Sequence, residues 1–282
     1  MLKIAIPNKG SLSEESVALL KACGYKCKRR GRELIVIDET NSIEFVYLRP
    51  RDIAVYVGSG IIELGITGRD LAIDSSAPVK ELLPLNFGNS KFFYAAPKNE
   101  ITNLEQLQGK RIATSYATIV KKDLTERGIE AEVVKLDGAV EISIRLGVAD
   151  VIADVVSSGL TLKEAGLEII GSPILESEAI LVSGHTNVPE KEEAKKLVDR
   201  MQGILHARTY AVVEYDVKKD ALNRACEITP GIESPTISPL AEENWIAVKS
   251  MIKRKEINSV MDKLKSIGAK GIIVTDIRTC RL

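Results

Sequence analysis

Histidine, cysteine and tryptophan are scarce in this chain of 282 residues, which has two histidines, four cysteines and one tryptophan. The cysteines form no CxxC pair and lie beside no histidine, so buried or idle thiols are favoured over a disulfide framework or a zinc site. Neither histidine lies in metal-ligand spacing. A Ser-His-Asp or Cys-His site is also not indicated, because no Ser or Cys in a recognisable nucleophile elbow accompanies either histidine. If the chain is an enzyme, its nucleophile therefore comes from a substrate. These residues are Cys23, Cys27, Cys226, Cys280, His185 and His206.

An excess of charge of either sign is also absent, because 39 Lys and Arg balance 39 Asp and Glu. This excludes a basic field for nucleic acid and a polybasic membrane patch, so any anionic ligand must be held by local groups. No apolar stretch approaches the roughly 20 residues of a membrane span. The N-terminal segment MLKIAIPNKG has one lysine and a short apolar run ended by Pro7, unlike a signal peptide. We expect a cytoplasmic protein with no nucleic-acid or membrane partner.

The first part of the chain alternates predicted strands and helices. Ser11 and Glu14 suggest a capping box for a helix that ends at Gly24. Pro50 opens a second helix, on which Ile53 and Val57 share one face. This alternation predicts α/β layers with a mostly parallel sheet. The strands are expected at 3–7, 33–38, 45–48 and 62–67.

A second α/β series begins near residue 91. Thr102 and Glu105 suggest a cap for a short helix, and further helices are expected at 118–127, from Gly138 and from Gly159. A strand at 178–184 and a helix at 189–205 are interpreted as the return of the chain to the first lobe. Two α/β lobes with a cleft between them result. The strands of the series are expected at 91–97, 111–116, 131–136, 151–156 and 167–171.

In the C-terminal part, from Arg208, the order of the predicted elements becomes β-α-β-β-α-β, which is the ferredoxin-like order. The strands are expected at 209–217, 236–240, 245–252 and 271–278, and the helices at 219–228 and 255–268. We therefore predict three domains: a first lobe (1–90 with 180–206), a second lobe (91–179) and a ferredoxin-like domain (207–282). Chains of this length usually contain more than one core.

Candidate binding chemistry gathers in loops that follow strands of the second lobe. After Asp154 come Ser157, Ser158, Gly159, Leu160 and Thr161, which form a small hydroxylated turn that opens a helix. Free backbone N–H groups and the helix dipole make such a turn a phosphate cradle, although plain N-capping by a serine explains it equally well.

The segment that contains Asp137, Gly138 and Glu141 also joins a strand to a predicted helix. Asp137 is either part of the site or a simple cap, and Glu141 is either part of the site or a solvated acid. Ligands bind at the carboxyl ends of strands in open α/β sheets. Glu141 and Asp154 can there accept hydrogen bonds from sugar hydroxyls or stabilise a cationic sugar centre.

Three charged loops follow predicted strands of the first lobe. One such loop is usually solvated surface, but three at equivalent sheet ends suggest an anion-lined cleft. Neither a Walker A motif nor a GxGxxG fingerprint is present. The loops are Asn8-Lys9-Gly10-Ser11, Arg49-Pro50-Arg51-Asp52 and Gly68-Arg69-Asp70.

Taken together, these segments closely resemble the long form of the ATP phosphoribosyltransferase family. The resemblance covers nearly the whole chain, its segment 135–167 is highly specific, and PGIESPTISPL marks the long form. Members typically carry Thr or Ala where Leu160 stands, a mild departure that leaves the backbone cradle intact. The matching stretches are IAIPNKGSLSEES, LRPRDIAVYVGSGIIELGITGRDL, KLDGAVEISIRLGVADVIADVVSSGLTLKEAGL and PGIESPTISPLAEENWIAVKSMI.

The resemblance implies two lobes like those of type II periplasmic binding proteins, and a regulatory ferredoxin-like domain. It implies that N1 of ATP attacks the anomeric carbon of 5-phosphoribosyl 1-pyrophosphate, at the first step of histidine biosynthesis. Mg²⁺ is then held mainly by substrate oxygens, with no metal site made of protein residues, which fits its preference for oxygen ligands. Histidine is implied as a feedback inhibitor, and we expect a homo-oligomer, a dimer and/or a hexamer.

The resemblance also assigns residues. Glu141 and Asp154 are catalytic and face the ribose. The phosphoribosyl pyrophosphate site adds Asp137, Gly138, Ser157, Ser158, Gly159, Leu160 and Thr161. The ATP and pyrophosphate site takes Lys9, Gly10, Ser11, Arg49, Arg69, Asp70, Tyr94, Thr114 and Tyr116, of which Tyr116 is equally compatible with the core. Histidine is assigned to Asp216, Ser234, Thr236 and Ser238, although Ser234-Pro235-Thr236 alone reads as a turn.

Two other classes of protein compete with the enzyme. A non-catalytic solute-binding protein suits a two-lobed cleft, but the chain shows no secretion signal and carries an additional regulatory-type domain. A ligand-sensing transcription factor would need a helix-turn-helix segment and a basic face, and neither is found.

Overall fold

The computed structural model describes residues 1–156, 160–184 and 191–281. They form two compact units, Met1–Lys195 and Lys196–Leu282, which we describe separately. Unit 1 contains two sheets, one for each predicted lobe, and unit 2 contains a third sheet. The division falls inside helix α6 (Glu192–Thr209), so most of this helix belongs to unit 2. Residues 196–206, which were predicted to belong to the first lobe, fall in unit 2 by this division.

Lobe I of unit 1 is a sheet covered by short helices. Its elements are β1 (Leu2–Pro7), α1 (Gly10–Ala22), β2 (Ile35–Asp38), η1 (Glu39–Asn41), β3 (Ile43–Leu48), α2 (Pro50–Gly58), β4 (Leu64–Gly68), α3 (Arg69–Ser75), β5 (Val79–Pro84) and β11 (Ala179–Gly184). The strand order is β2-β3-β1-β4-β11-β5, with β3, β1 and β4 parallel and β2 and β11 antiparallel to their neighbours. The sequence analysis assigned no structure to the segment that forms α3 and β5.

The core of lobe I depends on close packing of α2 against β4. Ile53 and Val57 are fully buried, which confirms that they share one face. A Cβ at Gly65 would lie 2.5 Å from Cγ2 of Ile53 and 2.9 Å from Cγ2 of Val57. Glycine at this position therefore lets α2 approach the strand, and fixes the start of α2 beside the end of the sheet.

Lobe II of unit 1 is a second sheet, with the order β10-β6-β9-β7-β8. Its elements are β6 (Ser90–Pro97), η2 (Leu104–Leu107), β7 (Arg111–Thr114), α4 (Ala117–Arg127), β8 (Glu132–Lys135), η3 (Val140–Ile142), β9 (Val151–Val156), α5 (Leu160–Glu164) and β10 (Leu167–Ser177). The helix predicted from Gly138 is wrong: only the short 3-10 turn η3 forms there. Gly138 and Ala139 have φ angles of 142° and 50°, which an α-helix does not allow.

Both lobes repeat one strand order. In lobe I the series is β3-β1-β4-β11-β5, and in lobe II it is β8-β7-β9-β6-β10. In each lobe, the strand that comes first along the chain lies between the second and the third, and all three are parallel. The next strand in the sheet is antiparallel and directly follows a crossing of the chain between the lobes: it is β11 in lobe I and β6 in lobe II. The last strand in the sheet is β5 in lobe I and β10 in lobe II. This is the two-lobed α/β architecture of type II periplasmic binding proteins that the resemblance implied.

The chain passes between the two sheets twice, and the two crossings are bonded to each other. Ser90, at the start of β6, pairs with Ser177, at the end of β10. The backbone N–H of Ala179 donates to the carbonyl of Phe87 at 2.8 Å, and its carbonyl accepts from the N–H of Leu85 at 2.9 Å. The connection between the lobes is thus a paired ribbon.

Two predicted helix caps are wrong in detail. Helix α1 begins at Gly10, one residue before the expected Ser11 cap, and Lys9 precedes it with no side-chain cap. The capping box of η2 is formed by Asn103 and Gln106, one residue after the expected pair. In both cases the helix begins within two residues of the expected position, but another residue occupies the capping position.

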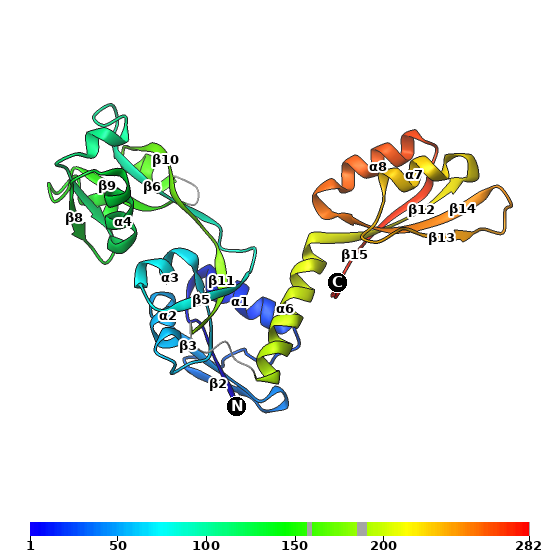
Figure 1. The fold of residues 1–282 in the computed structure, drawn as a ribbon, viewed down its shortest axis with the longest axis horizontal. Helices are drawn as coiled ribbons and strands as arrows, with labels where there is room; N and C mark the ends of the chain where they lie inside the picture. Colours follow the sequence, from blue (N-terminus) through cyan, green and yellow to red (C-terminus); the bar gives the residue numbers. More distant parts are fainter. Residues whose placement is uncertain (157–159, 185–190, 282) are drawn as a thin grey trace. The chain divides into compact units, whose positions relative to one another are not determined.

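Unit 2 has the ferredoxin-like order, as predicted. After α6 come β12 (Tyr210–Lys218), η4 (Lys219–Ala221), α7 (Leu222–Ile228), β13 (Thr236–Pro239), β14 (Trp245–Lys253), η5 (Arg254–Glu256), α8 (Ile257–Ser266) and β15 (Lys270–Asp276). The sheet order is β13-β14-β12-β15, and α7 and α8 lie on one face of it (Figure 1). Val213, Tyr215 and Val217 of β12 are buried with α7 and α8, and the alternate residues of β12 lie on the other face.

Candidate active site

The three charged loops of lobe I meet at one edge of its sheet, as the sequence predicted. Strands β1, β3 and β4 are parallel neighbours, and the N–H of Asn8 donates to the carbonyl of Leu48 at 2.8 Å. Helices α1 and α2 begin at this edge without a side-chain cap, whereas the first N–H groups of α3 donate to the carbonyl of Glu178 and the hydroxyl of Ser177. Lys9 and Arg49 are exposed there, so positive side chains and helix N-termini together favour an anion.

Arg69 belongs to the lobe connection and does not extend freely into solvent at this edge. Its Nε and Nη2 donate to Glu81 at 2.9 and 2.8 Å, and Nη2 also donates to Glu178 at 3.2 Å. The N–H of Arg69 donates to the carbonyl of Glu178, and the Glu178 carboxylate accepts from the N–H of Asn86. Hydrogen bonds to both acids raise the pKa of Arg69. The structure thus places this predicted phosphate ligand in a clamp on the crossing ribbon.

Replacing Arg69 by Met should destabilise the protein by about 1.5–3 kcal/mol at neutral pH, because two carboxylates lose charged hydrogen bonds. Thermal or urea unfolding of both variants measures this. Lys91→Met is the matched control, since the Lys91–Glu176 pair is exposed on both sides and should contribute less than about 1 kcal/mol. Wild-type stability in Arg69→Met, together with weaker substrate binding, would instead support the phosphate role.

Asp70 is buried beside the same connection. Its Oδ1 accepts a hydrogen bond from the hydroxyl of Ser177 at 2.8 Å, and that hydroxyl accepts from the N–H of Asp70 at 3.0 Å. The charge of Asp70 also raises the pKa of Tyr116, after the larger effect of burial. Asp70 therefore links the start of α3 to the end of β10 and faces the ring of Tyr116.

Two of the predicted nucleotide-site residues lie in the core of lobe II. Tyr94 is fully buried, and its hydroxyl donates to Asp123 at 3.0 Å. Thr114 is also fully buried, and its hydroxyl accepts from the N–H of Tyr116 at 2.9 Å, which shapes the turn before α4. These positions give Tyr94 and Thr114 structural roles, so we leave them out of the proposed site.

Asp154 lies near the carboxyl end of β9 with acidic and basic neighbours. Burial raises the pKa of its carboxyl group, and the charge of Glu141 raises it further. The N–H of Val155 donates to Asp154 at 2.7 Å and, together with the charge of Arg51, lowers this pKa. Glu141 comes from η3, where it is half-buried. Asp154, from strand β9, and Glu141, from η3, therefore interact electrostatically, and the charge of Arg51 acts on Asp154 in the opposite direction.

The remaining residues of the predicted phosphoribosyl site have varied outcomes. Asp137 and Gly138 are exposed in the turn before η3. Leu160 and Thr161 are exposed in the first turn of α5. Ser157, Ser158 and Gly159, the heart of the expected phosphate turn, lie outside the described residues. The prediction of the cradle therefore stays a prediction.

Arg51 and Asp74 were missed as site residues by sequence reasoning. Arg51 lies in a loop that we had singled out, but only the folded chain shows which neighbours it has. Its Nη1 lies 3.0 Å from Oδ2 of Asp74 and donates to the carbonyl of Ser115 at 2.8 Å, and its guanidinium carbon lies 4.8 Å from the centre of the Tyr116 ring. These contacts join lobe I to lobe II. No local sequence signal marks Asp74.

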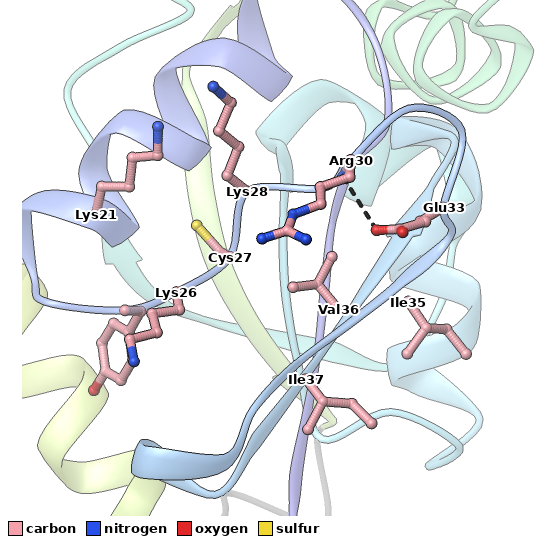
Figure 2. A pocket seen from close by; sticks show the side chains of 10 residues that line it. Lys21, Lys26, Cys27, Lys28, Arg30, Glu33, Ile35, Val36 and Ile37 are labelled. Carbon is pink, nitrogen blue, oxygen red and sulfur yellow. Dashed lines mark hydrogen bonds between the residues drawn. The ribbon is translucent and has the colours of Figure 1, made fainter.

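A cavity of about 680 Å³ lies away from these residues, between α1 and the edge strand β2 (Figure 2). The cavity is lined by four cationic side chains and by Ile35, Val36 and Ile37 of β2. The N–H of Arg30 donates to Glu33 at 3.1 Å. Positive charge beside an exposed strand edge opposes pairing with another chain. The cavity contains none of the predicted site residues, so we assign it no part in the substrate site. The cations are Lys21, Lys26, Lys28 and Arg30.

In unit 2, three of the residues predicted to bind histidine, Asp216, Thr236 and Ser238, share one face of the sheet. Directly opposed residues point to the same face, as do residues two apart along a strand. Asp216, Ala247 and Ser238 form one cross-strand row, and Glu214, Lys249 and Thr236 form the next. A cavity of about 530 Å³ on this unit is lined by Ser234 and Thr236 but not by Asp216 or Ser238. Its charged lining residues are Glu233, Lys249 and Arg281.

Two features are absent from residues 1–156, 160–184 and 191–281. No group of three or more His, Cys, Asp or Glu side chains there is arranged to hold a metal ion. Likewise, no helix in the described ranges is long and apolar enough to cross a membrane.

Comparison with known proteins agrees with this arrangement. A family model described as ATP phosphoribosyltransferase matches residues 49–203, and one described as HisG, C-terminal domain, matches residues 207–279. An ATP phosphoribosyltransferase of Salinibacter ruber is 56% identical over 100% of both chains, and one of Pseudarthrobacter chlorophenolicus is 52% identical, also over 100% of both.

A solved structure described as an ATP phosphoribosyl transferase (HisG:HisZ) complex from Thermotoga maritima is 26% identical in sequence. It covers 73% of this chain and 98% of that chain, with a TM-score of 0.64. The two family models together span most of both units, and the relatives match from end to end. The chain therefore belongs to the ATP phosphoribosyltransferase family.

Proposed function

We propose that the chain condenses ATP with 5-phosphoribosyl 1-pyrophosphate to give phosphoribosyl-ATP and pyrophosphate, at the first step of histidine biosynthesis. The observation that carries this proposal is the match, from end to end, to relatives described as ATP phosphoribosyltransferases, with Asp154 near the carboxyl end of β9 and Glu141 in η3 of lobe II. The relatives that match this chain over their full length are described as ATP phosphoribosyltransferases. The alternative of a non-catalytic binding protein is therefore not favoured.

In the proposed reaction, adenine N1 forms a bond to the anomeric carbon while the bond to pyrophosphate breaks. Positive charge develops on the ribose, and the carboxylates of Asp154 and Glu141 stabilise it and accept hydrogen bonds from ribose hydroxyls. Lys9 and Arg49, at the helix N-termini of lobe I, offset the charge of the pyrophosphate and of the ATP phosphates. The residues of the Ser157–Thr161 turn are proposed to hold the 5′-phosphate.

Mg²⁺ is proposed to accompany the substrates. It prefers oxygen ligands and commonly binds through one or two carboxylates plus substrate phosphates. Most of its ligands would be oxygens of the pyrophosphate and the ribose, and no metal site made of protein residues is proposed. When bound, the ion neutralises charge on the departing pyrophosphate. The protein residues orient the sugar and the nucleotide.

The direct test is to incubate the purified chain with ATP, phosphoribosyl pyrophosphate and Mg²⁺ and to measure pyrophosphate release. We expect release only when all three are present, together with a nucleotide product of higher mass than ATP. Release without ATP would indicate simple hydrolysis of the sugar pyrophosphate and would contradict the proposal.

Histidine is proposed as a feedback inhibitor that binds to unit 2. The support is the polar sheet face that carries Asp216, Thr236 and Ser238, next to the cavity lined by Ser234. An amino acid needs an acid for its ammonium group and donors for its carboxylate, and this face supplies both. Inhibition from there would act by favouring one global state of the protein.

Assembly and location complete the proposal. A homo-oligomer, a dimer and/or a hexamer, follows from the exposed sheet face and edges of unit 2, which suit packing between subunits. A cytoplasmic location matches the supply of ATP that the reaction needs. Sedimentation with and without histidine tests the oligomer.

A further inference from the structure

Helix α4 of lobe II has no cap of its own. Tyr116 occupies its N-cap position and makes no side-chain capping bond. The N–H groups of Thr118 and Ile119 instead donate to Oδ1 of Asp74, at 2.9 and 3.4 Å. Asp74 lies on α3, in the other lobe. The orphan donors at the start of this helix are thus satisfied across the lobe boundary.

The second oxygen of the same carboxylate holds Arg51. Oδ2 of Asp74 lies 3.0 Å from Nη1 of Arg51, and that nitrogen also donates to the carbonyl of Ser115 at 2.8 Å. The Asp74 side chain is only 10% exposed, whereas that of Arg51 is 43% exposed. The nearly buried carboxylate of Asp74 therefore fixes both the N-terminal end of α4 and the guanidinium of Arg51.

The groups held in this way meet at the side chain of Tyr116, which precedes α4. The guanidinium of Arg51 stacks on the Tyr116 ring at 4.8 Å. The positive charge of Arg51 acts on Asp154, and the charges of Asp70 and Asp154 act on Tyr116. An aspartate is among the best N-caps, and its charge is favourable at a helix N-terminus. The position of the Arg51 guanidinium over the Tyr116 ring thus depends on Asp74.

We propose that Asp74 is a positioning residue of the enzyme: reaching from lobe I, it caps α4 of lobe II and holds Arg51 over Tyr116. Docking of the lobes and alignment of the site are then one event, because separating the lobes removes the cap from α4 and the partner from Arg51. The kinetic part of this inference rests on the proposed function, and the structural part does not.

Hydrogen exchange tests the structural part without any substrate. In Asp74→Ala, the N-terminal amides of α4 should exchange about 5- to 30-fold faster than in the wild type, as expected for a lost helix cap. In Asp74→Asn, an oxygen remains to accept from these amides, so exchange should stay within about twofold of the wild type. Glu126→Ala, on the exposed side of α4, is the matched control. Unchanged exchange in Asp74→Ala would overturn the inference.

Kinetics test the positioning part. Asp74→Ala should lower kcat/KM for phosphoribosyl pyrophosphate at least fivefold, and Asp74→Asn should do so too, because its amide no longer pairs with Arg51. The effects of Asp74→Ala and Arg51→Met should be non-additive, since both break one unit. Additive effects of Asp74→Ala and Arg51→Met on kcat/KM would overturn the positioning role. A kcat/KM of Asp74→Ala equal to that of Glu126→Ala would also overturn it. If exchange changes as expected while the wild type releases no pyrophosphate, the proposed function fails and the cap stands.

Discussion

Replacing Asp154 by Asn should lower kcat by roughly 10- to 150-fold. The carboxylate is proposed to hold the ribose through charged hydrogen bonds, and each such bond contributes about 1.5–3 kcal/mol, which corresponds to this range of rates. Asn keeps the size and the oxygen that accepts from the N–H of Val155, so the loss reports the charge. Steady-state assays of pyrophosphate release measure the effect.

The same substitution should leave the protein at least as stable as the wild type at neutral pH. Burial raises the pKa of Asp154 in the folded protein above its ordinary value of 3.8. The folded state therefore binds this proton more tightly than the unfolded state, so stability falls as pH rises through the unfolded and then the folded pKa. Asn removes this cost. Thermal unfolding at pH 7 should show a Tm equal to or above that of the wild type.

Glu141→Gln should reduce kcat in the same way, and Glu105→Gln, exposed in η2, is the control that should not. The raised pKa also predicts that the acid limb of kcat/KM lies above pH 3.8, and that it moves to lower pH when Glu141 no longer adds its charge. Wild-type kinetics in both acid variants would remove these residues from the site.

Replacing Asp216 and Thr236 together by Ala should raise the histidine concentration for half-inhibition by at least about 100-fold. Each residue is proposed to bond to a charged group of the amino acid, and two bonds of about 1.5–3 kcal/mol give two or more factors of ten. The two side chains lie on one sheet face in neighbouring cross-strand rows, opposite Ala247 and Lys249. Inhibition assays and calorimetry measure the change.

Activity without histidine should stay unchanged in this double variant, because neither residue belongs to the acid site of unit 1. Asn258→Ala is the control: it is exposed on α8, which covers the opposite face of the sheet. Unchanged inhibition in the double variant, or no binding of histidine to the intact protein, would contradict the assignment.

The fold was predictable because its signals are local. Alternation in the segment that becomes β12 places Val213, Tyr215 and Val217 inward, and the ferredoxin-like order followed from it. The failures are equally specific. Gly138 and Ala139 were interpreted as opening a helix, but their left-handed backbone leads into a 3-10 turn. A pattern of residue types does not report this choice of φ.

The site was predictable only where a strand end marks it. Asp154 and Glu141 were found because they follow strands in a recognisable family segment. Arg69 stays a predicted phosphate ligand, but its contacts with Glu81 and Glu178 could not be predicted, because these acids come from distant segments. Asp74 gave no signal, since the amides that it caps lie 44 and 45 residues away. Such pairings exist only once the chain has folded.

The paired crossings between the lobes have a mechanical consequence. A single connecting strand can twist, stretch and bend, whereas two strands joined by hydrogen bonds resist sliding past each other. Ser90 with Ser177, and Phe87 with Ala179, make the connection such a ladder, and the Arg69 clamp anchors one end of it. Relative movement of the lobes is then restricted to flexing of the ribbon out of its own plane. Because the ribbon can flex in this one direction, the same residues of the two lobes would meet each time the lobes approach each other.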